Sequence, residues 1–492
     1  MNPRPNKGYL LAVIAVALIL RCAAIDSRGI QYDDAFSYFL SIQSIPDIIR
    51  GTAADTMPPL YYFLLHFWAL ISSKLWFLRL LSVIISLASV LLLYGLVDEL
   101  AGKKAALWAS IFASVSPLQI YHAQDIRMYA LLEFCLLGYA FSLVKLWKCE
   151  NCASKPVWLW QVAAILFGAG GMYTHNLAVF GLAAPNVWLF AKRDWRNLRK
   201  LFLMQAVIGL LALPWLLVIP GQIQKVQSAF WTPRPGLLEV LQAILMWFIH
   251  LPLNGVWMVV GAILSLQVFV LTLVLMWQGR KTRQEQGYLL VWAFFPPLIL
   301  FVISYLIRPV FVTRGFLVSS MAFYGLAGMV VARSDNLGKG MGVLVILAAA
   351  ISLPFFYSFS EFPRSPFQSL TNHLSQTVKT GEVIIHDNKL SFFPSHFYAP
   401  DLSQCFLGDV PGSSNDTYAI PSQQAMQLFP EPDLETAVGD ANIVHYVVFA
   451  KAIEDYQALG EEEHPALAWL ADHFNQVDRV EFNDLLLLTY HR

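Results

Sequence analysis

Long apolar runs recur along the first three quarters of the chain, and each is close to the roughly 20 residues that a helix needs to cross a bilayer. Eleven membrane-spanning helices are predicted, at residues 9–25, 76–97, 105–120, 128–147, 157–173, 176–191, 201–220, 255–277, 288–307, 314–332 and 340–358. The first run follows basic residues, as a signal peptide does, but lacks a convincing cleavage site and is expected to remain as a helix. A further apolar stretch at residues 58–71 is short and begins with two prolines, so whether it crosses the membrane or lies along it stays open.

After residue 360 the pattern changes to short segments with the periodicities of strands and amphipathic helices. Strands are expected at residues 381–388, 442–450 and 479–490, and helices at residues 365–379 and 454–474. We therefore predict two domains. Residues 1–359 form a helical membrane domain whose first outer loop is residues 26–75, and residues 360–492 form a small α/β domain.

Composition supports this division. With 57% hydrophobic and 13% charged residues and a mean hydropathy of +0.55, the chain is too apolar to be soluble throughout, and we predict a polytopic membrane protein. The formal net charge of +0 hides a partition, because residues 360–492 carry 19 acidic and 6 basic residues and thus a net charge of −13. An acidic domain argues against nucleic acid as a partner, since phosphate binding requires basic patches.

Positive charge indicates the orientation, because short cytoplasmic loops of membrane proteins are enriched in lysine and arginine. If residues 58–71 lie along the membrane, 17 of the 27 basic residues before residue 360 fall on one side, at the N-terminus and in the loops 102–104, 145–155, 192–200, 278–287 and 333–339. The acids of the first loop then fall on the opposite, outer side together with the acidic domain. Nearly every unusual polar cluster of the chain is predicted to face that outer compartment.

Two adjacent carboxylates, Asp33 and Asp34, lie just beyond the first predicted helix. A carboxylate pair at a membrane exit is a candidate reaction centre, although acids beside a bilayer are also ordinary loop charges. The pair could instead ligate a divalent cation, because such cations prefer oxygen ligands. No metal ligands are predicted, and a divalent cation stays an open alternative.

The segment HAQDIR, residues 122–127, brings charged side chains to the start of a predicted helix. An ionised side chain costs about 2.5–3.5 kcal/mol at the centre of a membrane span and less near the interface, so such residues need a reason. One interpretation of Asp125 and Arg127 is a helix cap with a neutralising arginine. The other is a second acid for a substrate beside a cation for a phosphate, with His122 next to them.

Three more basic residues fall at the outer ends of predicted helices. His175 sits in a turn between two apolar segments, where a histidine is usually structural and a functional role is the alternative. Arg308 and Arg314 lie on either side of Pro309. They are either interfacial anchors, whose stems lie along apolar surface, or ligands of an anion.

The order of these motifs along the chain is informative. The chain contains, in this order, the acid pair, PPLYY at residues 58–62, QDIRMYAL at 124–131, YTH at 173–175, and RP at 308–309 with a following arginine. This order resembles the bacterial dolichyl-phosphate-mannose-protein mannosyltransferase-like family, the PMT-like and ArnT-like glycosyltransferases of GT-C type. The resemblance covers about residues 8–330 and is weaker over the tail.

The resemblance implies roles for the residues that match its motifs. Asp33 would be the catalytic base that takes the acceptor's proton, with Asp34 beside it and Asp125 as a further acid. The donor phosphate would be bound by Arg127, His175, Arg308 and Arg314, and substrate contacts would come from Tyr32, Pro58, Pro59, Tyr61, His122 and Tyr129. Met57 departs from the pattern, because relatives often carry histidine or lysine before the two prolines, which shifts phosphate binding onto the other basic residues.

The predicted function is a membrane glycosyltransferase that moves a sugar from a polyprenyl-phosphate donor to a lipid, glycan or protein acceptor, with inversion. It would act at the periplasmic or exterior face of a bacterial inner membrane, among membrane lipids and without nucleic acid. The alternative is a lipid or polysaccharide transporter or flippase that binds a phosphate headgroup without chemistry. The chain has no evident internal repeat of the kind that many transporters contain, which disfavours this alternative. An inactive relative that serves as an assembly scaffold is a third interpretation, suggested by Met57.

Overall fold

The computed structural model describes residues 7–149, 157–228, 232–278, 283–334, 336–358, 365–411, 413, 416–458 and 463–492. The chain separates into two compact units. The membrane unit comprises Met1–Ile25, Thr56–Gln227 and Trp231–Ser358, and the α/β unit comprises Asp26–Asp55, Ser228–Phe230 and Phe359–Arg492. Residues 26–55 thus group with the C-terminal residues, whereas the prediction placed them in the membrane domain.

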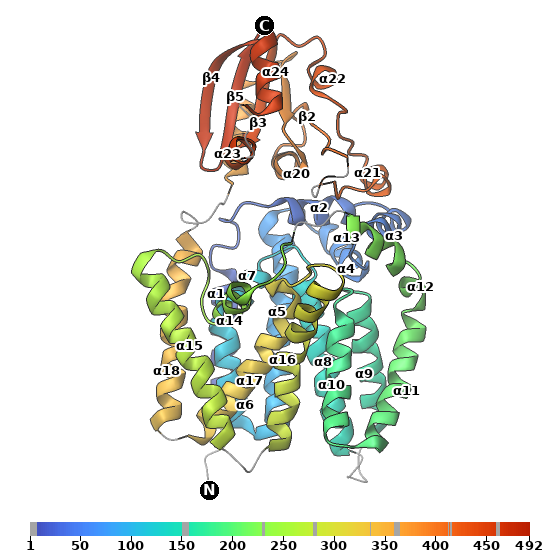
Figure 1. Ribbon diagram of the computed structural model, residues 1–492, viewed down its shortest axis with the longest axis vertical. Coiled ribbons are helices and arrows are strands. Elements are labelled where there is room, and N and C mark those ends of the chain that lie inside the picture. The colour runs from blue at the N-terminus through green and yellow to red at the C-terminus, as the bar shows by residue number, and fades with distance from the viewer. Residues whose placement is uncertain are drawn as a thin grey trace. The chain divides into compact units, whose positions relative to one another are not determined.

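The membrane unit is helical (Figure 1). Its helices are α1 (Lys7–Cys22), α4 (Leu60–Ala69), α5 (Leu75–Ala101), α6 (Lys103–Val115), α7 (Pro117–Ala123), α8 (Tyr129–Cys149), α9 (Val157–Met172), α10 (Ala178–Ala191), α11 (Trp195–Leu211), α12 (Leu213–Leu216), α13 (Ile219–Ser228), α14 (Leu237–Met246), α15 (Gly255–Gln278), α16 (Arg283–Leu306), η2 (Thr313–Phe316), α17 (Leu317–Arg333) and α18 (Asn336–Ser358). Nearly every residue of α17 is buried, so this helix lies at the core of the unit. A Cβ at Gly328 would lie 2.6 Å from the carbonyl oxygen of Ala105, which shows how closely α17 and α6 approach.

Among the described residues, six helices are long and apolar enough to cross a membrane: α5, α8 and α15 to α18, the span at α17 including η2. A seventh span results if the bent pair Trp195–Leu211 and Leu213–Gln224, which meet at 69°, counts as one. Each predicted run coincides with a helix, but α6, for example, has only 13 residues, so the predicted count of eleven spans is not confirmed. Helix α6 ends early because Ser116 precedes a proline and takes an extended conformation, which turns the chain into α7.

Helix α4 forms most of the ambiguous stretch at residues 58–71. It contains 10 residues. At about 1.5 Å per residue it is about 15 Å long, roughly half the thickness of the hydrocarbon core. Helix α4 by itself is therefore too short to cross the membrane.

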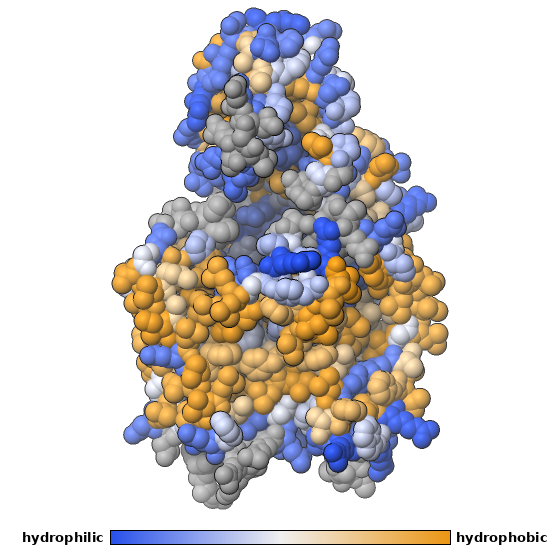
Figure 2. Space-filling view, viewed as in Figure 1, coloured by the Kyte–Doolittle hydropathy of each residue, from blue (hydrophilic) through white to orange (hydrophobic). Residues whose placement is uncertain are grey.

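The surface of the membrane unit is dominated by apolar side chains over its helices (Figure 2). Large side chains that are more than half exposed include Leu11, Leu166, Leu203, Leu210 and Trp277. Apolar surface of this extent is unfavourable in water but is matched by the acyl chains of lipids. The chain is therefore an integral membrane protein, as predicted.

One end of the membrane unit gathers basic side chains. Lys145 Nζ lies 2.7 Å from Glu99 Oε1, and Lys192 Nζ lies 3.2 Å from Gln284 Oε1. Helices α10, α15 and α17 end there, and α11, α16 and α18 begin there (Figure 1). The described ends of the predicted cytoplasmic loops at residues 192–200, 278–287 and 333–339 therefore share one end of the unit, and the side of the membrane that this end faces stays a prediction.

The α/β unit contains a five-stranded mixed sheet with the order β2-β1-β3-β5-β4. Its elements are α2 (Tyr32–Ser41), α3 (Ile45–Ala54), α19 (Phe367–Thr377), β1 (Val383–His386), α20 (Lys389–Tyr398), β2 (Gln404–Phe406), α21 (Ile420–Met426), α22 (Leu434–Val438), β3 (Ile443–Phe449), α23 (Ala450–Ala458), α24 (Pro465–His473), β4 (Asn475–Phe482) and β5 (Leu485–His491). Strands β1, β2 and β3 are parallel, whereas β5 runs antiparallel to both β3 and β4. Buried apolar residues form a core on each face of the sheet.

The strands at residues 381–388 and 442–450 are predicted correctly, as β1 and β3. The predicted strand at residues 479–490 is instead a hairpin, because β4 and β5 meet at a tight turn in which Asn483 has a φ of +54°. Asparagine tolerates this left-handed conformation better than most residues do, which makes it a common hairpin residue. Strand β2 has 3 residues and was not predicted.

Candidate functional site

A bend between α7 and α8 carries two of the predicted site residues, Asp125 and Arg127. Ser116 caps α7, and the chain bends at residues 124–128 before α8 begins. The side-chain amide of Gln124 donates hydrogen bonds of 2.9 Å to the carbonyl oxygens of Arg21 and Ala23. The bend is thereby fastened to the end of α1, so the side chains on it occupy defined positions.

His122, near the end of α7, and Asp125, on the bend, form a buried pair. Nδ1 of His122 lies 2.9 Å from Oδ2 of Asp125, and the two side chains are 8% and 10% exposed. A carboxylate against one ring nitrogen fixes the orientation of the imidazole and leaves the other nitrogen for a further partner. The predicted second acid is thus held by a neighbouring histidine.

The ring of Tyr129, at the start of α8, is where predicted site residues from distant segments meet. The guanidinium carbon of Arg127 lies 6.0 Å from the ring centroid, and that of Arg314 lies 5.5 Å from it. The rings of His122 and His175 lie 5.3 and 5.9 Å away. With Asp125, these residues are called the Tyr129 cluster below. The fold therefore brings together six predicted residues from three stretches of the chain.

His175 lies in the loop between α9 and α10, outside the spanning helices. Its Nδ1 accepts a hydrogen bond of 3.0 Å from the backbone N–H of Leu177, which places the proton of the neutral ring on Nε2. Burial, together with the positive charges of Arg127 and Arg314, lowers the pKa of His175 to about 3. His175 is therefore a neutral hydrogen-bond donor between two cations.

The loop of His175 is joined to the proline motif. The prolines at residues 58–59 are buried, and the backbone N–H of Leu60 donates a 2.9 Å hydrogen bond to the carbonyl of Tyr173. The amide of Asn176 donates to the carbonyl of Thr56 at 2.9 Å. Residues 56 and 60, on either side of the prolines, thus help to position the loop that carries His175.

Tyr61 and Arg308 have different surroundings. Tyr61 is 1% exposed, and its hydroxyl lies 3.2 Å from Oγ of Ser82 on α5. The Tyr61 hydroxyl thus joins α4 to α5, and its contact with a substrate stays a prediction. Arg308 is partly exposed in the link between α16 and η2, whereas Arg314, on η2, belongs to the cluster.

The acid pair lies in the α/β unit, in the first turn of α2. Carboxylates are favoured there by the partial positive charge of a helix N-terminus. Asp34 is 5% exposed and Asp33 is partly exposed, so Asp33 is the more accessible of the two. The neighbouring Tyr32 packs edge-on against Phe393 with 5.3 Å between ring centroids, and burial and nearby carboxylates raise the pKa of its hydroxyl. The structure thus distinguishes two adjacent acids by their burial.

Sequence reasoning missed a buried polar group beside the Tyr129 cluster. Glu133, one turn further along α8, is 1% exposed, and its Oε2 accepts a 2.7 Å hydrogen bond from the side chain of Gln119. Gln119 also donates to Oγ of Ser320 on α17 at 3.0 Å. Together these residues tie α7 and α8 to the central helix. The available signal was a single acid within an apolar run, which in a membrane needs a partner.

Within the described part of the chain, no three histidine, cysteine, aspartate or glutamate side chains are grouped so that they could hold a metal ion. The Tyr129 cluster instead supplies arginines and neutral or weakly basic rings. Such groups bind anions through charge-assisted hydrogen bonds.

Residues 56–218 match the family described as dolichyl-phosphate-mannose-protein mannosyltransferase. This segment contains every member of the Tyr129 cluster except Arg314. No curated protein matches the chain by sequence.

Solved structures resemble the chain over almost its whole length. ArnT from Cupriavidus metallidurans bound to undecaprenyl phosphate is 13% identical and gives a TM-score of 0.66, with 98% of each chain covered. The structure of the same ArnT in the apo state is 14% identical and gives a TM-score of 0.64, again with 98% of each chain covered. The apo oligosaccharyltransferase from Archaeoglobus fulgidus is 13% identical and gives a TM-score of 0.54, and the match covers 95% of this chain and 72% of the oligosaccharyltransferase. The GT-C fold predicted from the sequence is confirmed.

Proposed function

We propose that this chain, a PMT-like and ArnT-like GT-C protein, is a membrane glycosyltransferase that moves a sugar from a polyprenyl-phosphate donor to an acceptor. It would act at the periplasmic or exterior face of a bacterial inner membrane. The observation that carries the proposal is the Tyr129 cluster, in which two arginines and a neutral histidine surround one ring.

The cluster suits a phosphate. Arg127 and Arg314 outnumber the single carboxylate of Asp125, so the fixed charges favour an anion. Guanidinium groups bind phosphate oxygens through paired hydrogen bonds, and His175 offers one further N–H. These donors would also stabilise the charge that develops on the departing phosphate, because they are already gathered around the Tyr129 ring before reaction. A polyprenyl chain would be accommodated by the apolar surface of the helices.

Asp33 is proposed as the general base. Its partial exposure suits a group that must reach the acceptor, whereas burial of Asp34 suits a supporting role. Removal of the proton from the acceptor hydroxyl or amine lets that group attack the anomeric carbon while the bond to phosphate breaks. A direct displacement of this kind inverts the anomeric centre. General-base help of this kind contributes about 10²- to 10⁴-fold in rate.

Solved relatives provide support for the donor class. One ArnT structure contains undecaprenyl phosphate, and AglB from Archaeoglobus fulgidus is described in complex with an inhibitory peptide and a dolichol-phosphate. Both ligands are polyprenyl phosphates of the class proposed here. Lipid, glycan and protein acceptors all present a hydroxyl or amine that fits the chemistry.

The test is a transfer assay with the purified protein in nanodiscs. Synthetic undecaprenyl-phosphate sugars are supplied with a bacterial envelope extract as acceptor, and released undecaprenyl phosphate is measured by mass spectrometry. A transferase releases the lipid phosphate and needs both protein and acceptor. Binding of the lipids without release, for every sugar supplied, contradicts the proposal and favours the transporter interpretation.

A further inference from the structure

The α/β unit contains a cavity of about 520 Å³ that the transferase chemistry does not use. It is lined by residues that follow each of the three parallel strands: Asp387 and Asn388 after β1, Gly408 and Asp409 after β2, and Asp455 and Tyr456 after β3. In sheets of this kind, ligands bind at the carboxyl ends of the strands where the strand order reverses. Here β1 lies between β2 and β3, so the cavity is at such a point.

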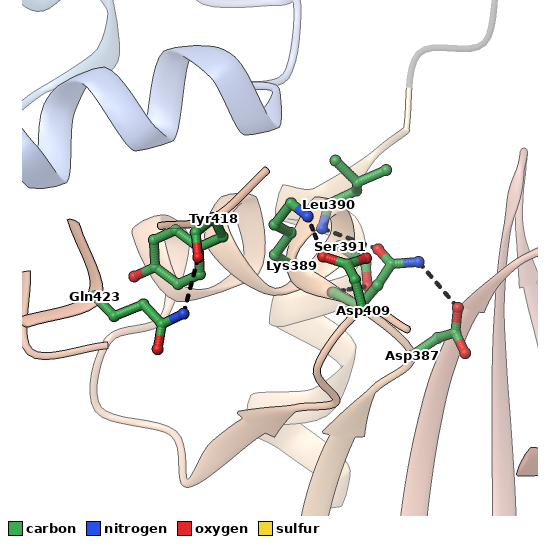
Figure 3. Close-up of polar contacts among 8 residues, drawn as sticks. Asp387, Lys389, Leu390, Ser391, Asp409, Tyr418 and Gln423 are labelled. Carbon is green, nitrogen blue, oxygen red and sulfur yellow. Dashed lines mark hydrogen bonds and ion pairs between the residues drawn. The ribbon is translucent and has the colours of Figure 1, made fainter. Parts of the chain in front are cut away.

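Two carboxylates of the cavity lining, Asp387 and Asp409, are held by polar neighbours, some of which are drawn in Figure 3. Oδ1 of Asp387 accepts a 2.7 Å hydrogen bond from the hydroxyl of Tyr446 and lies 3.3 Å from Nε2 of His464. The ammonium group of Lys389 pairs with Oδ2 of Asp409 (Figure 3). The cavity therefore presents acceptor oxygens in set positions.

His464 is buried in the wall of the cavity. The residue is 4% exposed, and its Nε2 lies 3.3 Å from Oδ1 of Asp387. The imidazole therefore helps to hold this carboxylate in place.

Aromatic rings complete the wall. Trp469 lines the cavity, and one face of its indole is covered by His473 with 4.1 Å between ring centroids, which holds the indole in place. Tyr456 packs edge-on against His464 at 4.6 Å. Fixed aromatic rings beside carboxylate acceptors offer an apolar face together with polar partners.

The charges restrict the ligand. Three carboxylates line the cavity, from Asp387, Asp409 and Asp455, against the one buried ammonium group of Lys389, and the whole unit is acidic. This excess of negative charge disfavours phosphate and carboxylate ligands. It favours a molecule with many hydroxyl donors, since carboxylates accept strong hydrogen bonds from them.

We propose that this cavity is a saccharide-binding site for sugars without acidic groups. Asp387 and Asp409 accept hydrogen bonds from sugar hydroxyls, and Trp469 contacts a sugar face. The proposal stands independently of the transferase activity, because its ligand binds without reacting.

The test is calorimetric titration of the full-length protein in nanodiscs with chitotetraose, mannotetraose and maltotetraose, and with tetragalacturonic acid as the acidic counterpart. At least one neutral tetrasaccharide is expected to bind and the acidic one is not. Trp469→Ala and Asp387→Asn should each weaken that binding about ten-fold or more. Asp455→Asn, on the exposed rim, should weaken it by a smaller factor without affecting folding.

Matched controls are Phe429→Ala and Asp478→Asn, which alter exposed residues of the same unit outside the cavity lining. They should bind as the unaltered protein does. The melting temperature of each variant, read by fluorescence, separates loss of the site from loss of the fold. The proposal is overturned if no neutral tetrasaccharide binds, if the acidic one binds as well, or if folded Trp469→Ala and Asp387→Asn proteins bind normally.

Discussion

The neutral state of His175 has a measurable consequence for stability. Because burial and two arginines lower its pKa to about 3 in the folded protein, the unfolded chain, in which an ordinary histidine titrates near 6.5, takes up the proton first. Stability from this residue is therefore fully present above pH 6.5 and is lost progressively as the pH falls from about 6.5 towards 3.

The size of the effect follows from these two values. At pH 5 the unfolded state is almost fully protonated at this position and the folded state almost unprotonated. The difference corresponds to about 2 kcal/mol of unfolding free energy lost between pH 8 and pH 5, by proton linkage. The measurement is the melting temperature of the purified protein between pH 8 and pH 5.

The variant that isolates this effect is His175→Asn. The asparagine carbonyl oxygen can replace Nδ1 as acceptor for the N–H of Leu177, but the side chain does not titrate. Its melting temperature should fall less between pH 8 and pH 5 than that of the unaltered protein. His473→Asn, at an exposed position, should behave like the unaltered protein. An unchanged pH dependence in His175→Asn refutes the assignment of a neutral histidine between the arginines.

Three further predictions address the membrane unit. Arg314→Gln should weaken binding of undecaprenyl phosphate about 10- to 150-fold, which corresponds to the loss of one hydrogen bond to a charged group. The control Arg333→Gln, at the other end of α17, should bind the lipid normally, and native mass spectrometry measures both affinities. Tyr61→Phe should change the rate of sugar transfer by no more than about two-fold and lower the free energy of unfolding by about 1 kcal/mol, because the tyrosine hydroxyl forms a hydrogen bond with Ser82. A large loss of transfer would instead show that Tyr61 contacts a substrate. Arg21→Leu should lower the free energy of unfolding by at least about 1.5–3 kcal/mol, because the guanidinium donates hydrogen bonds to Ser86 and to the carbonyls of Ala113 and Ser114. Denaturant titration in detergent measures this loss, and an unchanged unfolding midpoint would contradict the prediction.

Periodicity predicted where most helices and strands lie, because a long apolar run or an alternating one is a local property of the sequence. It could not predict the number of spans, since Ser116 and Pro117 cut a continuous apolar run into α6 and α7. It also merged β4 and β5, because the turn at Asn483 is short. Both differences arise where one or two residues redirect the chain.

The members of the candidate site were predicted by type, but their arrangement was not. Tyr129 joins residues from the bend before α8, from the loop after α9 and from η2, and tertiary packing alone decides which of them meet. The same limit hid the cavity of the α/β unit, because Asp387 and Asp409 look like ordinary loop acids until the strands are placed side by side.

The central claim, that Asp33 is the base of a sugar transfer, is tested most directly by comparing Asp33→Asn with the unaltered protein. Initial rates of undecaprenyl phosphate release should fall by about 10²- to 10⁴-fold, while binding of the lipid donor stays unchanged, because a general base acts on the acceptor and not on the phosphate. Asp26→Asn, at an exposed position of the same loop, should transfer at the normal rate. Undiminished transfer by Asp33→Asn would contradict the account.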